Sequence, residues 1–244
     1  MPNFCPEFYL VKIVNRGKMV ETIIRNDIPF DEGNYQLIEY QDNYLIDDKK
    51  KIKVKDLGSK VALTNAFFFD YLKEYHIPTA FLRKDGDNAL KFSTYTEFPF
   101  KIKILNTADK RNAKIFGLKE GSELNLPVFE FHYGCGKESV ITESHLIAFD
   151  LCTPEDMKLI TRICSKINAV LKSFFERRNE TLAEVCCHFG KYEDKVFLVG
   201  DFTPASIKIL PKDESVKWTN PYKLSTANEV KKYTEHLFNI ASVK

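Results

Sequence analysis

Residues 184–210 read EVCCHFGKYEDKVFLVGDFTPASIKIL. Two short runs, AEVCCHFG and KVFLVGDF, are predicted to form strands joined by the short turn KYED. Asp201 follows the second strand directly, and Pro204 favours a turn before a third strand. A carboxylate between a strand and a turn is well placed to hold a metal ion, but this stretch supplies only one such acid.

The composition of the 244-residue chain is that of a globular protein with a phenylalanine-rich core. Apolar residues make up 44% of the chain, with 20 Phe and one Trp. The net charge of +2 gives no argument for a nucleic-acid or acidic-membrane partner. No segment approaches the roughly 20 apolar residues of a membrane helix, and no signal peptide is evident. We therefore expect a cytoplasmic protein, with its six cysteines as free thiols.

The first third of the chain is predicted to be rich in strands. Residues 8–56 contain short runs that alternate between polar and apolar residues and end at polar or glycine positions, which is typical of hairpins. The basic run at residues 49–55 is interpreted as a solvated hairpin. Leu63, Phe67 and Tyr71 then have helical spacing, and Pro78 ends that helix.

The rest of the chain mixes strands with helices. A long helix is predicted from Thr153, which can act as its N-cap, with Pro154 at the first helical position and an apolar stripe behind it. A short helix ends at Gly117 or Gly121, and residues 228–240 form a last amphipathic helix. Because the strands and helices follow no strict βαβ period, the predicted class is α+β.

Four phrases along the chain occur in an order that is typical of one enzyme family. They are NRGKM (15–19), IPTAFL (77–82), GLKEGSELNLPVFEF (117–131) and ITESHL (141–146). Together with residues 184–210, they resemble the SAICAR synthetase family over nearly the whole chain. The resemblance implies a two-lobed fold, with a β-rich lobe (1–84), a larger α+β lobe (85–244) and a nucleotide cleft between them.

The same resemblance implies an ATP-dependent ligase. In the family, a carboxylated aminoimidazole ribotide of purine biosynthesis is joined to aspartate through an amide bond. Gly17 and Lys18 match the family's RGK segment under the ATP phosphates. A glycine lets backbone amides approach phosphate, and a lysine adds a point charge. Lys91, on a strand expected to line the cleft, is a second candidate for ATP binding.

The positions that hold magnesium in the family are altered. The family's Lys-Leu-Glu-Phe-Gly strand reads Cys-Cys-His-Phe-Gly here, so that His188 replaces a glutamate. Gly200 replaces the aspartate of the following turn. Magnesium prefers oxygen ligands, whereas histidine suits zinc, manganese or iron better. Asp201 and His188 are the remaining candidates for a divalent metal, Mg or Mn.

Positions that match the family's substrate site also differ. Ala205 replaces a second aspartate, Lys208 replaces an arginine, and the glycine-rich loop GCGKES (134–139) keeps one acid. The candidate catalytic residues are Asp201 and Lys208, and the candidate substrate-binding residues are Asn106, Arg111 and Glu138. Lys101 and Lys103 are an alternative site for a phosphate or carboxylate. These changes favour small-molecule carboxylate and amine substrates other than the family's ribotide.

Three hypotheses stay open. The first is an ATP-dependent ligase for another carboxylate, which should need Asp201. The second is a non-catalytic relative with a binding or scaffolding role, which should not need Asp201. The third, SAICAR synthetase itself, requires the original chemistry with most of its ligands replaced. A homo-oligomer also stays open.

The Cys186–Cys187–His188 run has three interpretations of its own. Because successive strand residues face opposite sides, Cys186 and His188 should share one face and Cys187 should lie on the other. The pair on one face is either a buried structural pair, the start of a metal site with Asp201, or a nucleophilic dyad.

Overall fold

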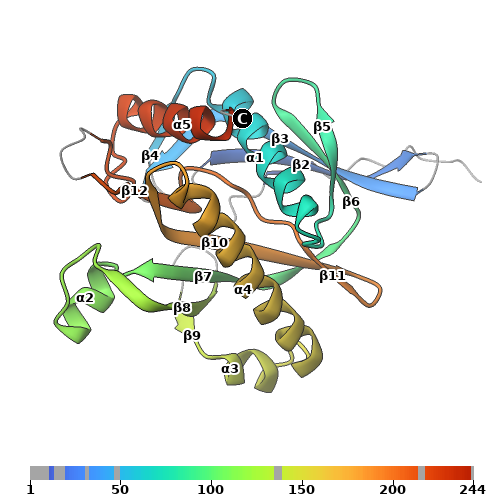
Figure 1. The fold of residues 1–244 in the computed structure, drawn as a ribbon. Helices are drawn as coiled ribbons and strands as arrows, with labels where there is room; N and C mark the ends of the chain where they lie inside the picture. The colour runs from blue at the N-terminus through green and yellow to red at the C-terminus, as the bar shows by residue number, and fades with distance from the viewer. Residues whose placement is uncertain are drawn as a thin grey trace, which may run out of the picture.

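Two antiparallel sheets organise the protein (Figure 1). The computed structural model describes residues 11–13, 20–30, 33–46, 50–134, 139–213 and 218–242. The first sheet has the strand order β1-β2-β3-β6-β5, with β4 on β3. Its strands are β1 Val11–Ile13, β2 Val20–Phe30, β3 Gly33–Ile46, β4 Lys50–Lys53, β5 Phe81–Asp85 and β6 Ala89–Ser93.

The second sheet has the order β11-β10-β7-β8-β9, with β12 on β10. Its strands are β7 Thr96–Thr107, β8 Glu123–Tyr133, β9 Ser139–Ile141, β10 Glu180–Tyr192, β11 Lys195–Leu198 and β12 Ile207–Pro211. The helices are α1 Leu57–Glu74, α2 Lys110–Phe116, α3 Glu143–Ala148, α4 Pro154–Glu176 and α5 Ala227–Ser242. The predicted α+β class is therefore confirmed.

The lobe boundary expected after residue 84 falls within the β5–β6 hairpin of the first sheet. β6 lies beyond residue 84, yet it pairs with both β3 and β5 in the first sheet. The chain passes to the second sheet between β6 and β7, at Thr94–Tyr95. The reason is the β5–β6 hairpin, which adds both of its strands to the same sheet.

Helix α4 confirms the sequence prediction in detail. The Thr153 side chain accepts a hydrogen bond from the Asp156 backbone N–H at 3.1 Å, and Pro154 begins the helix. The apolar stripe from Met157 to Phe175 is buried, and α4 lies across β10 and β7 (Figure 1). None of the helices in the described ranges has the length and apolar character needed to span a membrane.

Phenylalanines join the helices to the turn that follows Asp201. The ring of Phe202 lies 5.2 Å from that of Phe68 and 5.3 Å from that of Phe69, both in α1. Phe174 of α4 packs against Phe68 at 5.4 Å. The prediction of a phenylalanine-rich core is therefore confirmed, and this core positions the turn.

Asn65 of α1 fixes the same turn through its amide. Its Oδ1 accepts a hydrogen bond from the Phe202 backbone N–H at 2.7 Å. Its Nδ2 donates to the carbonyl oxygens of Val61 at 2.9 Å and Phe202 at 3.3 Å. Asn65 is fully buried, so these bonds replace water that cannot reach the turn. The helix thus holds the backbone next to Asp201.

We predict that Asn65→Ala destabilises the fold by about 2–4 kcal/mol, because it leaves the Phe202 N–H buried without an acceptor and opens a cavity. Urea unfolding measures the loss. The exposed Asn228→Ala variant is the control and should change stability by less than about 0.5 kcal/mol. Equal effects of the two substitutions would contradict the role of Asn65.

Candidate active site

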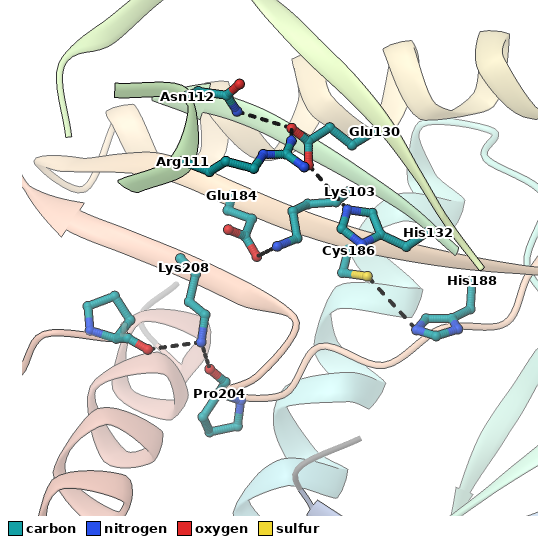
Figure 2. Close-up of polar contacts among 11 residues, drawn as sticks. Lys103, Arg111, Asn112, Glu130, His132, Glu184, Cys186, His188, Pro204 and Lys208 are labelled. Atoms are coloured by element: carbon teal, nitrogen blue, oxygen red, sulfur yellow. Dashed lines mark hydrogen bonds and ion pairs between the residues drawn. The ribbon is translucent and has the colours of Figure 1, made fainter. Parts of the chain in front are cut away.

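Four strands of the second sheet bring polar side chains to one face. Lys103 of β7 is paired with Glu130 of β8 on one side and with Cys186 of β10 on the other. Glu184 of β10 is paired with Lys208 of β12. Paired residues share a face, so these side chains form one surface, the polar face, shown in part in Figure 2. It comprises Lys101, Lys103, Glu130, His132, Glu184, Cys186, His188 and Lys208.

The opposite face belongs to the core under α4. Cys187 is buried there, as the alternation in this strand predicted. Cys186 and His188 share the polar face, with Sγ and Nε2 4.0 Å apart. His188 Nδ1 also lies 3.5 Å from Glu97 Oε1. Although burial opposes ionisation, His188 and Lys101 lower the pKa of the Cys186 thiol.

A small cavity of about 30 Å³ joins the polar face to the turn. Its walls include Cys186, His188, Asp201, Thr203 and Ser206. Asp201 and His188, the two predicted metal ligands, are therefore brought to one cavity.

The Asp201 carboxylate is oriented from the first sheet. It is 2% exposed, and its Oδ1 accepts a hydrogen bond from the Tyr40 hydroxyl at 2.9 Å. Burial, followed by the charge of Asp201, raises the pKa of Tyr40 well above its usual value. The tyrosine therefore stays protonated and keeps donating to the carboxylate.

Lys208 is held from two loops. Its Nζ donates to the carbonyl oxygens of Pro204 at 2.7 Å and Pro221 at 2.9 Å (Figure 2). Burial lowers the pKa of the amine to about 8, against the opposing charge of Glu184. An ammonium has three donors, and two of them hold the backbone here. Lys208 thus ties the turn after Asp201 to the segment before α5.

Arg111 reaches the polar face from α2. Asp109 caps this helix through a hydrogen bond from the Asn112 N–H at 2.7 Å, and Arg111 forms an ion pair with Glu130. Glu130 also accepts from Asn112 Nδ2 at 3.0 Å and meets His132 at 3.2 Å (Figure 2). Despite its burial, these partners lower the pKa of Glu130 to about 2. The carboxylate therefore stays ionised and fixes the guanidinium.

Two predicted residues lie elsewhere. Lys91 pairs with Leu37, and the alternation along β3 puts both on the face opposite Tyr40, away from Asp201. The Asn106 side chain is turned toward α4, where it exchanges two hydrogen bonds with Asn168 at 2.8 and 2.9 Å. The structure does not bring these two side chains to the cavity, because each lies on the other face of its strand.

Three further candidates, Gly17, Lys18 and Glu138, lie outside the described residues. Conversely, the sequence did not single out Glu130 as part of a network or Glu184 as a partner of Lys103, whose Nζ lies 3.5 Å from the Glu184 carboxylate. Alternation along a strand tells which of its residues share a face with each acid. Only the pairing of β7, β8, β10 and β12 shows that the faces carrying Glu130, Lys103 and Glu184 form one surface.

Comparison with known proteins gives the family. Residues 21–237 match the family model described as SAICAR synthetase. The chain belongs to the SAICAR synthetase family. Its homologues are ATP-dependent C–N ligases, and the resemblance noted from the sequence is confirmed.

Individual relatives agree with this assignment. The phosphoribosylaminoimidazole-succinocarboxamide synthase of Thermoanaerobacter sp. strain X514 is 27% identical over 190 residues, which cover 77% of this chain and 81% of that protein. The crystal structure of the Ehrlichia chaffeensis synthase has a TM-score of 0.80 at 20% identity, with 94% and 99% coverage. A type-2 SAICAR synthetase in complex with ADP has a TM-score of 0.79 at 21% identity, with 93% and 96% coverage. These structures share the two-lobed fold predicted from the sequence.

Within this SAICAR synthetase fold, Gly200 and His188 fit one another closely. A Cβ atom added at Gly200 would lie 2.8 Å from the His188 backbone nitrogen and 3.3 Å from its ring carbon Cδ2. Such a contact forces a displacement of the backbone. An aspartate cannot therefore return to position 200 while β10 keeps its place beside the turn.

The donor set near Asp201 differs from what a magnesium ion needs. Magnesium prefers oxygen ligands in octahedral geometry, whereas Cys186 and His188 offer sulfur and nitrogen. Within the described ranges, no three His, Cys, Asp or Glu side chains are grouped so as to hold a metal ion. The residues present do not fit magnesium held by protein side chains alone.

We predict that Gly200→Ala destabilises the protein by about 1–3 kcal/mol, because the new methyl group meets the His188 backbone. Chemical unfolding measures the change, with Ala205→Ser in the same cavity as the control. In a His188→Ala background the penalty should be smaller but not absent, since only the contact with the ring is removed. A neutral Gly200→Ala would show that the turn has room to move.

We predict that the buried amine of Lys208 makes the stability of the protein depend on pH. Its pKa is about 8 in the folded protein against the usual 10.5, so the unfolded state binds more protons between these values. The free energy of unfolding therefore gains a rising contribution from about pH 8 to 10.5, and below pH 8 the buried charge opposes folding. Lys208→Met should flatten this rise relative to wild type, while Lys84→Met, at the β5–β6 turn, should not. Identical pH profiles for all three proteins would show that the Lys208 amine does not cause the rise in stability.

Proposed function

We propose that this protein is an ATP-dependent ligase that joins a carboxylate to an amine through an acyl phosphate. The observation that carries the proposal is the polar face, which brings Lys101 to the same cavity as a rigidly held Asp201 and meets Arg111 of α2 at Glu130. A surface of this kind suits an anionic substrate. The γ-phosphoryl group of ATP passes to the carboxylate and ADP leaves. The amine then displaces phosphate to form the amide.

Each group has a role in this proposal. Gly17 and Lys18 bind the ATP phosphates, as their position in the family's RGK segment suggests. Lys103 and Arg111 bind the acidic substrate, and Asp201 faces the reacting phosphate. Lys208 stabilises the turn that carries Asp201 and lies at the edge of the substrate site. Mg²⁺ or Mn²⁺ would arrive as the companion of ATP, because the described donor set does not hold magnesium by itself.

We further propose that the carboxylate substrate is not the ribotide named in the relatives. Support comes from His188, Gly200 and Ala205, which replace three acids of the family's pattern, and from the tight fit of the first two. The loss of three acids from one site is expected if the site has been rebuilt for another ligand. A cytoplasmic location and a homo-oligomer stay predictions.

A second candidate function is a non-catalytic relative that binds ligands or partners. It is favoured by the lack, within the described ranges, of a three-residue group able to hold a metal. The two proposals differ over Asp201. A ligase needs the carboxylate for turnover, whereas a scaffold needs it only for stability.

We predict that ATP with Mg²⁺ or Mn²⁺ raises the melting temperature of the wild-type protein. A nucleotide concentration of 100 times the dissociation constant should raise the free energy of unfolding by about 2.7 kcal/mol. Lys18→Ala and Asp201→Asn should lose the shift, whereas Lys84→Ala, at the β5–β6 turn, should keep it. A wild-type protein with no shift at any nucleotide concentration would contradict the ligase proposal and favour the scaffold.

We also predict ADP release that depends on both a carboxylate and an amine. Once a substrate pair is found, Arg111→Met should raise the KM for the carboxylate about 10-fold or more, because a charged hydrogen bond is lost. The exposed Arg83→Met is the matched control. Formation of SAICAR from carboxyaminoimidazole ribotide, aspartate and ATP would overturn the substrate part of the proposal and leave the ligase part standing.

A further inference from the structure

A second and larger pocket lies beside α5, away from the polar face. It encloses about 300 Å³ between β10, β12, α5 and the segment at Trp218, a volume within the range of small-molecule sites. Its walls include Glu180, Ile209, Trp218, Lys232, Tyr233 and His236. None of these residues takes part in the ligase reaction proposed above.

A β-bulge separates this pocket from the polar face. Glu180 and Glu184 lie four residues apart on β10, so regular alternation would place both on the same face. The register of β10 against β12 shifts between Leu182 and Glu184, where one extra residue is inserted. Glu184 therefore shares a face with Lys208, whereas Glu180, paired with Pro211, lies on the other face. The two acids thus serve separate sites.

Glu180 is a buried carboxylate with an unused acceptor. Its side chain is 10% exposed, and Oε1 accepts a hydrogen bond from His236 Nε2 at 2.8 Å. Oε2 is buried and has no hydrogen-bond partner among the described residues. A buried carboxylate oxygen without a donor is costly, so the Glu180 carboxylate is suited to a further N–H group supplied by a ligand.

The other walls determine what shape and charge the ligand can have. Trp218 is 40% exposed and offers an aromatic face, and Ile209 adds an apolar wall. The Tyr233 hydroxyl already donates to Ile207 O at 3.1 Å and accepts from Ile209 N at 3.0 Å, so its ring contributes only apolar surface. An aromatic face next to a carboxylate attracts a flat cation. Lys232 opposes such a cation, but it is exposed and therefore more strongly screened than Glu180.

We propose that this pocket binds a small planar organic cation, an amidinium or guanidinium group carried on a ring. The N–H groups donate to the Glu180 carboxylate, and the ring lies against Trp218. Because the bulge separates the pocket from the polar face, binding there does not depend on the ligase function.

Benzamidine is a suitable probe, and the chain supplies its own reporter. Trp218 is the single tryptophan, so intrinsic fluorescence reports on this pocket directly. We expect a saturable fluorescence change with benzamidine and none with benzoate or benzyl alcohol, which share its ring but lack the cation. Glu180→Gln should weaken benzamidine binding at least 10-fold, and Lys232→Ala should tighten it. Glu176→Gln, an acid at the end of α4, is the matched control.

Two results would overturn the proposal: benzamidine binding that is unchanged in Glu180→Gln, or benzoate binding as well as benzamidine does. Circular dichroism and melting temperature verify the folding of each variant. If Glu180→Gln fails to fold, Trp218→Ala provides the second test. Calorimetric titration of this variant with benzamidine should show weakened binding, and unchanged affinity would count against the site.

Discussion

The hydrogen bonds between Asn65 and the backbone of Phe202 are the constraint on which the site depends. They tie the turn after β11 to α1, and α1 packs on the first sheet. Tyr40 reaches across from that sheet to Asp201. The carboxylate is thus fixed by both sheets at once. The phenylalanine cluster around Phe202 adds apolar burial to the same junction, so the position of Asp201 is coupled to the stability of the whole core.

The polar face shows how neighbours determine whether a charge on a sheet adds to stability or reduces it. Glu130 has Arg111 as a partner of opposite charge, and Lys208 has the carbonyl oxygens of Pro204 and Pro221. Buried charges are tolerable only with such partners. At Glu130 the neighbours outweigh burial, and the low pKa keeps the carboxylate ionised. At Lys208 burial outweighs the charge of Glu184, and the pKa of the amine falls.

Gly200 and His188 illustrate why single replacements in this SAICAR synthetase fold are not independent. The glycine allows β10 to approach the turn, and the backbone nitrogen and Cβ of His188 occupy the space that a side chain at position 200 would need. The bulge in β10 has a comparable effect at longer range. One inserted residue sends Glu180 and Glu184 to opposite faces, and the strand contributes to two pockets of different chemistry.

The sequence by itself determined the α+β class, the N-cap of α4, the alternation of Cys186 and Cys187 and, through its phrases, the family. These features depend on local periodicity, on capping chemistry or on order along the chain. Tertiary structure decided which faces meet. Lys91 and Asn106 lie on suitable strands but point away from the cavity, and Glu130 and Glu184 join the site only through strand pairing. Strand register and bulges arise from contacts between distant residues, and a local pattern does not encode them.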